Sequence, residues 1–157
     1  HPSTFITCVD RLEHRFVTHA CTGTVEGFSM QYLQLDVLSE QFLQTLRQVI
    51  ADQRQPTVLL GMHLCGYLSI QAVKAFLSAP LAVALILSPC CLPAKGSDEQ
   101  LDYLFASKDP LRQYETWADH LEACLQSNGS GVQVTRTVVH EVLSPKNIVI
   151  SAQKPSD

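Results

Sequence analysis

Two short apolar segments of this chain each end in side chains that can do chemistry. One leads into a His-Leu-Cys-Gly segment at His63–Gly66, and the other into a Pro-Cys-Cys segment at Pro89–Cys91. Imidazoles and thiols serve proteins as bases, nucleophiles and metal ligands. Their position at the ends of two apolar runs predicts one shared site rather than scattered surface residues.

An amphipathic stretch separates the two apolar segments, and this pattern predicts buried parallel strands joined by a crossover helix. In open α/β sheets the ligand crevice lies beyond the carboxyl ends of the strands. We therefore expect four side chains to lie together in such a crevice as candidate catalytic groups: His63, Cys65, Cys90 and Cys91.

A zinc site is one interpretation of these residues, but their spacing disfavours it. Zinc sites usually draw on Cys-x2-4-Cys pairs, whereas neighbouring side chains of a strand such as Cys90 and Cys91 point apart. The His-x-Glu and Pro-Cys-x-x-Cys signature of zinc deaminases is also missing. We therefore expect no metal site.

A Cys/His nucleophilic pair is a second interpretation, in which His63 lowers the pKa of Cys90. The alternative is that a buried cysteine fills the crevice as a small apolar residue. The sequence shows no acid or amide that would orient the histidine. A chain of this length and apolarity does not need disulfide staples, so its six cysteines are expected to be reduced thiols in an intracellular compartment.

The surrounding pattern predicts one α/β domain over residues 1–157, in the order β, β, α, β, α, β, α, α, β, β. Ser39 is the expected N-cap of the first helix, and the last two strands are expected to pair antiparallel. The predicted strands are Thr4–Asp10, Met30–Asp36, Thr57–Met62, Leu81–Leu87, Val132–Val139 and Asn147–Ala152. The predicted helices cover about 39–53, 69–78, 98–106 and 110–126, and a loop is expected over Pro89–Gly96.

Composition excludes several function classes. With 46% apolar and 17% charged residues, the 157-residue chain is ordinary for a folded domain and is not expected to be disordered. The net charge of −4 does not resemble a nucleic-acid-binding surface. An RNA substrate would therefore need a basic domain or subunit elsewhere. No apolar run approaches the roughly 20 residues of a membrane span.

Together, these segments resemble one branch of the class I, Rossmann-like methyltransferases that use S-adenosylmethionine. The specific part is Gly61–Ser69, with its His-x-Cys-Gly-x-x-Ser pattern, followed by Pro89–Cys91. The branch includes tRNA 2′-O-methyltransferases and methyltransferase-like proteins of unsettled substrate. Ser144–Asn147, before the last strand, also fits the group.

The resemblance implies a role for each matching position. Asp10 and Arg11 would follow one strand and contact the cofactor ribose, and Asp36 with Val37 would lie near the adenine. Strand-end acids of this kind accept hydrogen bonds from nucleotides in α/β folds, although they are also common as solvated acids. His63 would lie near both cofactor and acceptor, as a possible general base, and the thiols would line the acceptor side.

One part of the family pattern is missing from this sequence. The family's first strand ends in an acidic residue followed by Gly-x-Gly, which binds the methionine part of the cofactor, and it should precede His1. That strand is central in the implied sheet, between the strands ending at Asp10 and Met62. We therefore expect a further chain or segment to complete the sheet, without which the chain should not fold.

Two functions follow from the resemblance. The first is methyl transfer from S-adenosylmethionine, with RNA such as tRNA or rRNA as the acceptor. The second is a catalytically degenerate, methyltransferase-like structural subunit of a large assembly such as a ribonucleoprotein. The acidic charge and the missing glycine loop favour the second, whereas Asp10, Asp36 and the His63–Gly66 segment favour the first.

Overall fold

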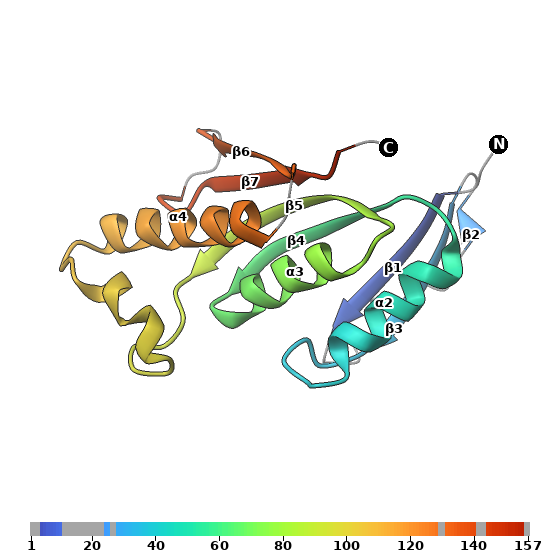
Figure 1. The fold of residues 1–157 in the computed structure, drawn as a ribbon, viewed down its shortest axis with the longest axis horizontal. Coiled ribbons are helices and arrows are strands. Elements are labelled where there is room, and N and C mark those ends of the chain that lie inside the picture. Colours follow the sequence, from blue (N-terminus) through green and yellow to red (C-terminus); the bar gives the residue numbers. More distant parts are fainter. Residues whose placement is uncertain (1–3, 11–23, 26–27, 129–130, 141–143, 156–157) are drawn as a thin grey trace. The chain divides into compact units, whose positions relative to one another are not determined.

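The computed structural model describes residues 4–10, 24–25, 28–128, 131–140 and 144–155. These residues fall into two compact units, His1–Phe42 and Leu43–Asp157. Each unit contains its own sheet, and each is considered by itself (Figure 1).

The first unit holds a three-stranded sheet with the order β1-β3-β2. Strand β1 (Thr4–Asp10) runs parallel to β3 (Phe28–Gln34), in register over all seven residues of both strands. The two-residue strand β2 (Thr24–Val25) pairs antiparallel with β3. Since β3 separates β1 from β2, β1 lies at an edge of this sheet.

The second unit holds a mixed sheet with the order β4-β5-β7-β6. Strands β4 (Thr57–Cys65) and β5 (Ala82–Cys91) are parallel, as the crossover pattern predicts. Strand β7 (Ile148–Gln153) lies between β5 and β6 (Gln133–Val138) and is antiparallel to both. The expected antiparallel pair at the end of the chain is therefore confirmed.

Helices α3 (Tyr67–Ser78) and α4 (Pro110–Asn128) pack against this sheet and against each other, so they cover one face of it (Figure 1). Helix α2 (Phe42–Gln53) precedes β4, and a 3-10 helix, η1 (Glu99–Phe105), precedes α4. The buried side chains of α4 recur at the helical spacing that makes a continuous apolar stripe. They are Tyr114, Trp117, Ala118, Leu121 and Leu125.

Within the second unit, one face of β4 carries an exposed row of apolar side chains. Val58, Leu60 and Met62 alternate along the strand and are 52%, 70% and 60% exposed. Side chains two residues apart on a strand share a face, so these three form a continuous row. Because β4 is also an edge strand, its exposed apolar row lies beside backbone groups with no neighbouring strand in this sheet.

The α/β class and the mixed sheet agree with the sequence-based expectation, while several details were wrong. Strand β5 continues to Cys91, where a loop was expected from Pro89. Ser39 does not cap α2, because the helix begins at Phe42 and the buried Ser39 hydroxyl has no hydrogen-bond partner. The short strand β2 was not predicted. Across the described residues, no helix has the length and apolarity needed to cross a membrane.

Candidate functional site

The candidate site lies where the parallel strands β4 and β5 end. Cys65, the last residue of β4, is paired in register with Cys91, the last residue of β5. The Gly66 N–H also donates a hydrogen bond of 2.9 Å to the Cys91 carbonyl oxygen. The expectation that these segments meet at one edge of the sheet is confirmed, because adjacent parallel strands end on the same side.

His63 lies in a break of the strand pairing. The register of β4 on β5 shifts between Met62 and Leu64, so His63 has no partner residue in the ladder. Its φ angle is +54°, a left-handed conformation that costs a non-glycine residue of order 1–3 kcal/mol. Bulges of this kind re-aim side chains and are frequent beside active sites. The His63 side chain is exposed here.

Gly66 makes the tight transition from β4 to α3. Its φ of +54° and ψ of −124° suit glycine alone, and a Cβ atom there would lie 3.1 Å from the Cα of Pro93. Three residues later, the fully buried Ser69 hydroxyl donates a 2.7 Å hydrogen bond to the Leu64 carbonyl oxygen. These contacts fix the backbone on both sides of Cys65.

Three thiols meet at this point. The sulfur atoms of Cys65, Cys90 and Cys91 all lie within 4.8 Å of one another, and Sγ of Cys65 is 2.8 Å from Sγ of Cys90. The argument that adjacent strand residues point apart therefore fails for Cys90 and Cys91. Here the ladder is irregular near its end, with register shifts on both sides of Leu64.

The thiols differ in their tendency to ionise. Hydrogen bonding from Cys65 lowers the pKa of Cys91, and the Lys146 ammonium, 3.8 Å from its sulfur, lowers it further. Burial and the neighbouring thiols raise the pKa of Cys90 to about 12. Of these two thiols, Cys91 therefore ionises more readily than Cys90, and the Lys146 ammonium lies beside it.

His63 does not activate Cys90 in this arrangement. The His63 ring is not part of the sulfur cluster, and among the described residues no hydrogen bond joins it to a thiol. The cation beside a thiol is Lys146, which the sequence suggested only as part of Ser144–Asn147, the segment before the last strand that fits the methyltransferase group. Its contact spans 55 positions, so local spacing carried no signal for it.

The four cofactor residues expected before His63 differ in how much of each the structure describes. Asp10 ends β1, and Arg11 lies outside the described residues. Asp36 follows β3, where one carboxylate oxygen accepts a 2.9 Å hydrogen bond from the Leu38 N–H. Val37 lies in the same turn. These residues belong to the first unit, whereas the thiols belong to the second.

A second polar cluster, on α4 and η1, was not predicted. The Tyr103 hydroxyl lies 2.7 Å from Nδ1 of His120, and Sγ of Cys124 lies 3.4 Å from its Nε2. The His120 ring also stacks on Trp117, with ring centroids 5.5 Å apart. Burial lowers the pKa of His120 and raises that of Cys124. His120 and Cys124 are therefore both uncharged at neutral pH, unlike an activated thiolate–imidazolium pair.

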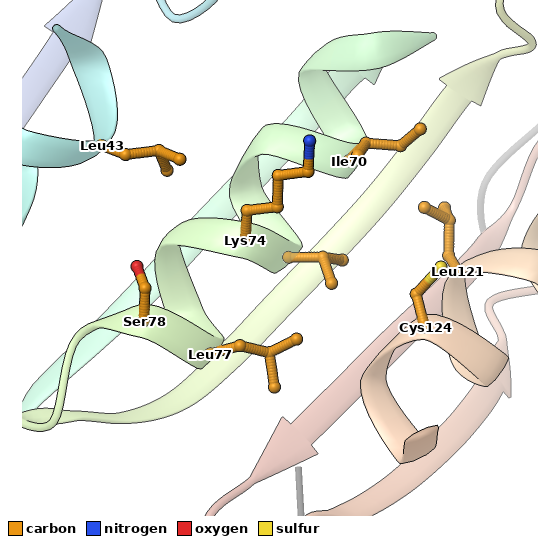
Figure 2. A pocket seen from close by; sticks show the side chains of 8 residues that line it. Leu43, Ile70, Lys74, Leu77, Ser78, Leu121 and Cys124 are labelled. Carbon is orange, nitrogen blue, oxygen red and sulfur yellow. The ribbon is translucent and has the colours of Figure 1, made fainter. Parts of the chain in front are cut away.

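Cys124 also borders an apolar cavity of about 490 Å³ between α3, α4 and the start of α2 (Figure 2). Apolar side chains dominate its wall, with Lys74 and Ser78 as the polar additions. None of the residues at the β4 and β5 ends lines this cavity. The lining residues are Leu43, Ile70, Val73, Lys74, Leu77, Ser78, Leu121 and Cys124.

Comparison with known proteins adds no relative to this picture. No protein-family model, no curated protein and no solved structure matches the chain.

Proposed function

We propose that this chain takes part in methyl transfer from S-adenosylmethionine, with RNA as the acceptor. The observation that supports it is the placement of the family-like segments His63–Gly66 and Pro89–Cys91. They lie side by side at the carboxyl ends of two adjacent parallel strands, where α/β folds bind their ligands.

The cofactor-binding residues that the resemblance names fit the cofactor in part. The Asp36 carboxylate uses one oxygen in its turn, which leaves the other for an adenine amino group. By the resemblance, Asp10 and Arg11 would contact the ribose, and Val37 would lie near the adenine. The glycine-rich loop expected for the methionine part has no match in the sequence, so in this proposal another segment or chain supplies that part of the site.

When bound, S-adenosylmethionine would supply an electrophilic methyl group: an acceptor oxygen or nitrogen bonds to the methyl carbon as the carbon–sulfur bond breaks and S-adenosylhomocysteine leaves. In this proposal the chain mainly aligns the acceptor. An exposed imidazole at the strand end, His63, accepts the proton that the acceptor loses. The strained backbone at His63 is consistent with a functional position, because such strain concentrates at active sites.

We further propose that a strand from another segment or chain completes the sheet. Strand β4 is an edge strand, and its row of Val58, Leu60 and Met62 is exposed. Exposed apolar sheet edges are rare in folded proteins because they promote association with other chains. A strand that paired with β4 and carried the glycine-rich loop would supply the missing part of the cofactor site.

Calorimetric titration of the full-length protein with S-adenosylmethionine tests this function. One binding site per chain is expected, with transfer of a radiolabelled methyl group to a pool of unmodified RNA. His63→Gln should slow transfer by roughly 100-fold or more while binding changes little, because a general base contributes to the chemical step. An absence of detectable cofactor binding would overturn the proposal.

The second candidate is a catalytically degenerate subunit of a ribonucleoprotein or another large assembly. The net charge of −4 and the exposed row on β4 favour it, because the row is suited to burial against a partner. In that case the protein should co-purify in a stable assembly, fail to bind S-adenosylmethionine, and tolerate His63→Gln without loss of assembly. Cofactor binding together with His63-dependent transfer would exclude this alternative.

A further inference from the structure

The thiols of Cys65, Cys90 and Cys91 form a compact group at the end of the β4–β5 pair. Their sulfur atoms lie within 4.8 Å of one another. We propose that this three-cysteine cluster binds one thiophilic metal ion, Zn²⁺ or Cu⁺, through three thiolate bonds. The inference depends on the arrangement of the sulfur atoms and is independent of methyl transfer.

The distances suit a single ion. Thiolates that share one zinc ion at about 2.3 Å lie about 3.8 Å apart in a tetrahedral arrangement. The sulfur atoms of the three-cysteine cluster are within 4.8 Å of one another, and the closest pair, Cys65 and Cys90, is separated by 2.8 Å. That pair must therefore open by about 1 Å. The exposed Cys65 side chain has room for this adjustment.

The backbone that carries the thiols is already held in place. The hydrogen bond from Gly66 N–H to the Cys91 carbonyl joins the two strand ends, and the in-register pairing of Cys65 with Cys91 fixes their separation. The buried Tyr114 hydroxyl donates a 3.1 Å hydrogen bond to the carbonyl oxygen of Pro89, the residue before Cys90. Ion binding therefore requires side-chain rotation rather than folding of a loop, which lowers its entropic cost.

Charge and coordination number favour two ions, Zn²⁺ and Cu⁺. Three thiolates carry three negative charges, and the Lys146 ammonium, 3.8 Å from Sγ of Cys91, offsets one of them. A divalent ion would bring the total to zero. No histidine, aspartate or glutamate among the described residues joins the three sulfur atoms, so Zn²⁺ would take water as its fourth ligand, as in open zinc sites. Cu⁺ is also favoured by thiolates and would need no fourth ligand.

The test is anaerobic titration of the reduced, metal-free protein with Zn²⁺, Co²⁺ and Cu⁺ in separate experiments. One ion per chain is expected. Co²⁺, a spectroscopic substitute for Zn²⁺, should give a thiolate-to-metal charge-transfer band with tetrahedral d–d bands. Loss of a thiolate removes a direct bond, so Cys65→Ser, Cys90→Ser and Cys91→Ser should each weaken binding by more than about 100-fold. Cys124→Ser, in α4 and outside the cluster, is the matched control and should bind as the unaltered protein does.

A measurement on the unaltered protein guards against variants that fail to fold. Bound ion should protect Cys65, Cys90 and Cys91 from maleimide, as located by peptide mass spectrometry, while Cys124 keeps its reactivity. If Zn²⁺ alone binds tightly, the site is the open zinc type, and if Cu⁺ alone binds, it is the three-coordinate type. The proposal is overturned if none of the ions binds, if Cys65→Ser binds unchanged, or if a Cys65–Cys90 disulfide persists in reducing buffer.

Discussion

The hydroxyl of Tyr114 donates a 3.1 Å hydrogen bond to the carbonyl oxygen of Pro89, although 25 positions separate the two residues. The same hydroxyl accepts a 3.1 Å hydrogen bond from the backbone N–H of Ile148. One buried side chain of α4 thus satisfies backbone groups of both β5 and β7. It does so where the β5–β7 ladder has ended, since the last paired residue of β5 is Leu87.

Removing this hydroxyl should lower the free energy of unfolding of the domain that carries the cysteine cluster. Tyr114→Phe leaves the Pro89 carbonyl and the Ile148 N–H without their partner in a buried place, which should cost about 1–3 kcal/mol in the free energy of unfolding. Urea denaturation measures this cost. Tyr67→Phe is the control, because the only contact that the described part of the chain shows for the Tyr67 hydroxyl is a long, exposed one of 3.5 Å from Ser97. If both variants lose the same free energy of unfolding, the two hydrogen bonds of the Tyr114 hydroxyl contribute nothing to stability.

Gly66 should be far less tolerant of substitution than another glycine with positive φ. Gly66→Ala combines an unfavourable backbone conformation with a Cβ atom 3.1 Å from the Cα of Pro93, and about 3 kcal/mol of destabilisation is expected. Gly96→Ala has the same sign of φ but no atom within 4 Å of the added Cβ, so about 1 kcal/mol is expected. Thermal unfolding of both variants tests the difference, and a smaller effect at Gly66 would contradict this account.

The sequence predicted most elements because their apolar patterns are long and regular. The strand Thr4–Asp10 has the predicted bounds, and α3, α4 and the parallel β4–β5 pair lie close to the expected ranges. The extension of β5 through Pro89 was missed, since proline lacks the N–H that a strand interior normally needs. Here Pro89 pairs with Leu64 beside the bulge, one of the few strand positions that proline tolerates.

The site was predictable only as far as local spacing reaches. The meeting of Cys65 with Cys90 and Cys91 followed from two neighbouring parallel strands that end at the same edge. The contacts of Lys146 and Tyr114 with this edge depend on how β7 and α4 pack, and no spacing rule encodes that. His63 was grouped with the thiols because both segments follow predicted parallel strands, but the bulge gives its side chain a separate, exposed position.

The apolar row on β4 should make the purified chain self-associate. Leu60 is 70% exposed, and burying such a side chain is worth about 1.5–3 kcal/mol. Leu60→Lys should therefore weaken association by roughly tenfold or more in sedimentation experiments. Leu111→Lys changes a similarly apolar residue, about half exposed on α4, and should leave association as it was. If both variants associate like the unaltered chain, the row is not the contact surface.

His120 should make stability depend on pH in the mildly acidic range. Burial lowers its pKa below the ordinary value of 6.5, although the charge of Asp98 opposes the shift. Its hydrogen-bond partners are Tyr103 and Cys124, whose pKa values burial raises, so both remain uncharged there.

Below pH 6.5 the unfolded chain therefore binds a proton at this histidine that the folded chain does not, and protonation favours unfolding. The free energy of unfolding should fall as the pH drops from 6.5 through the lower folded pKa, and this contribution should then level off. Chemical denaturation at a series of pH values measures the slope. His120→Gln should reduce the slope by at most the contribution of one bound proton. His140→Gln changes a histidine at an exposed position and should leave the slope as it was. An unchanged slope in His120→Gln would assign the pH dependence to other groups.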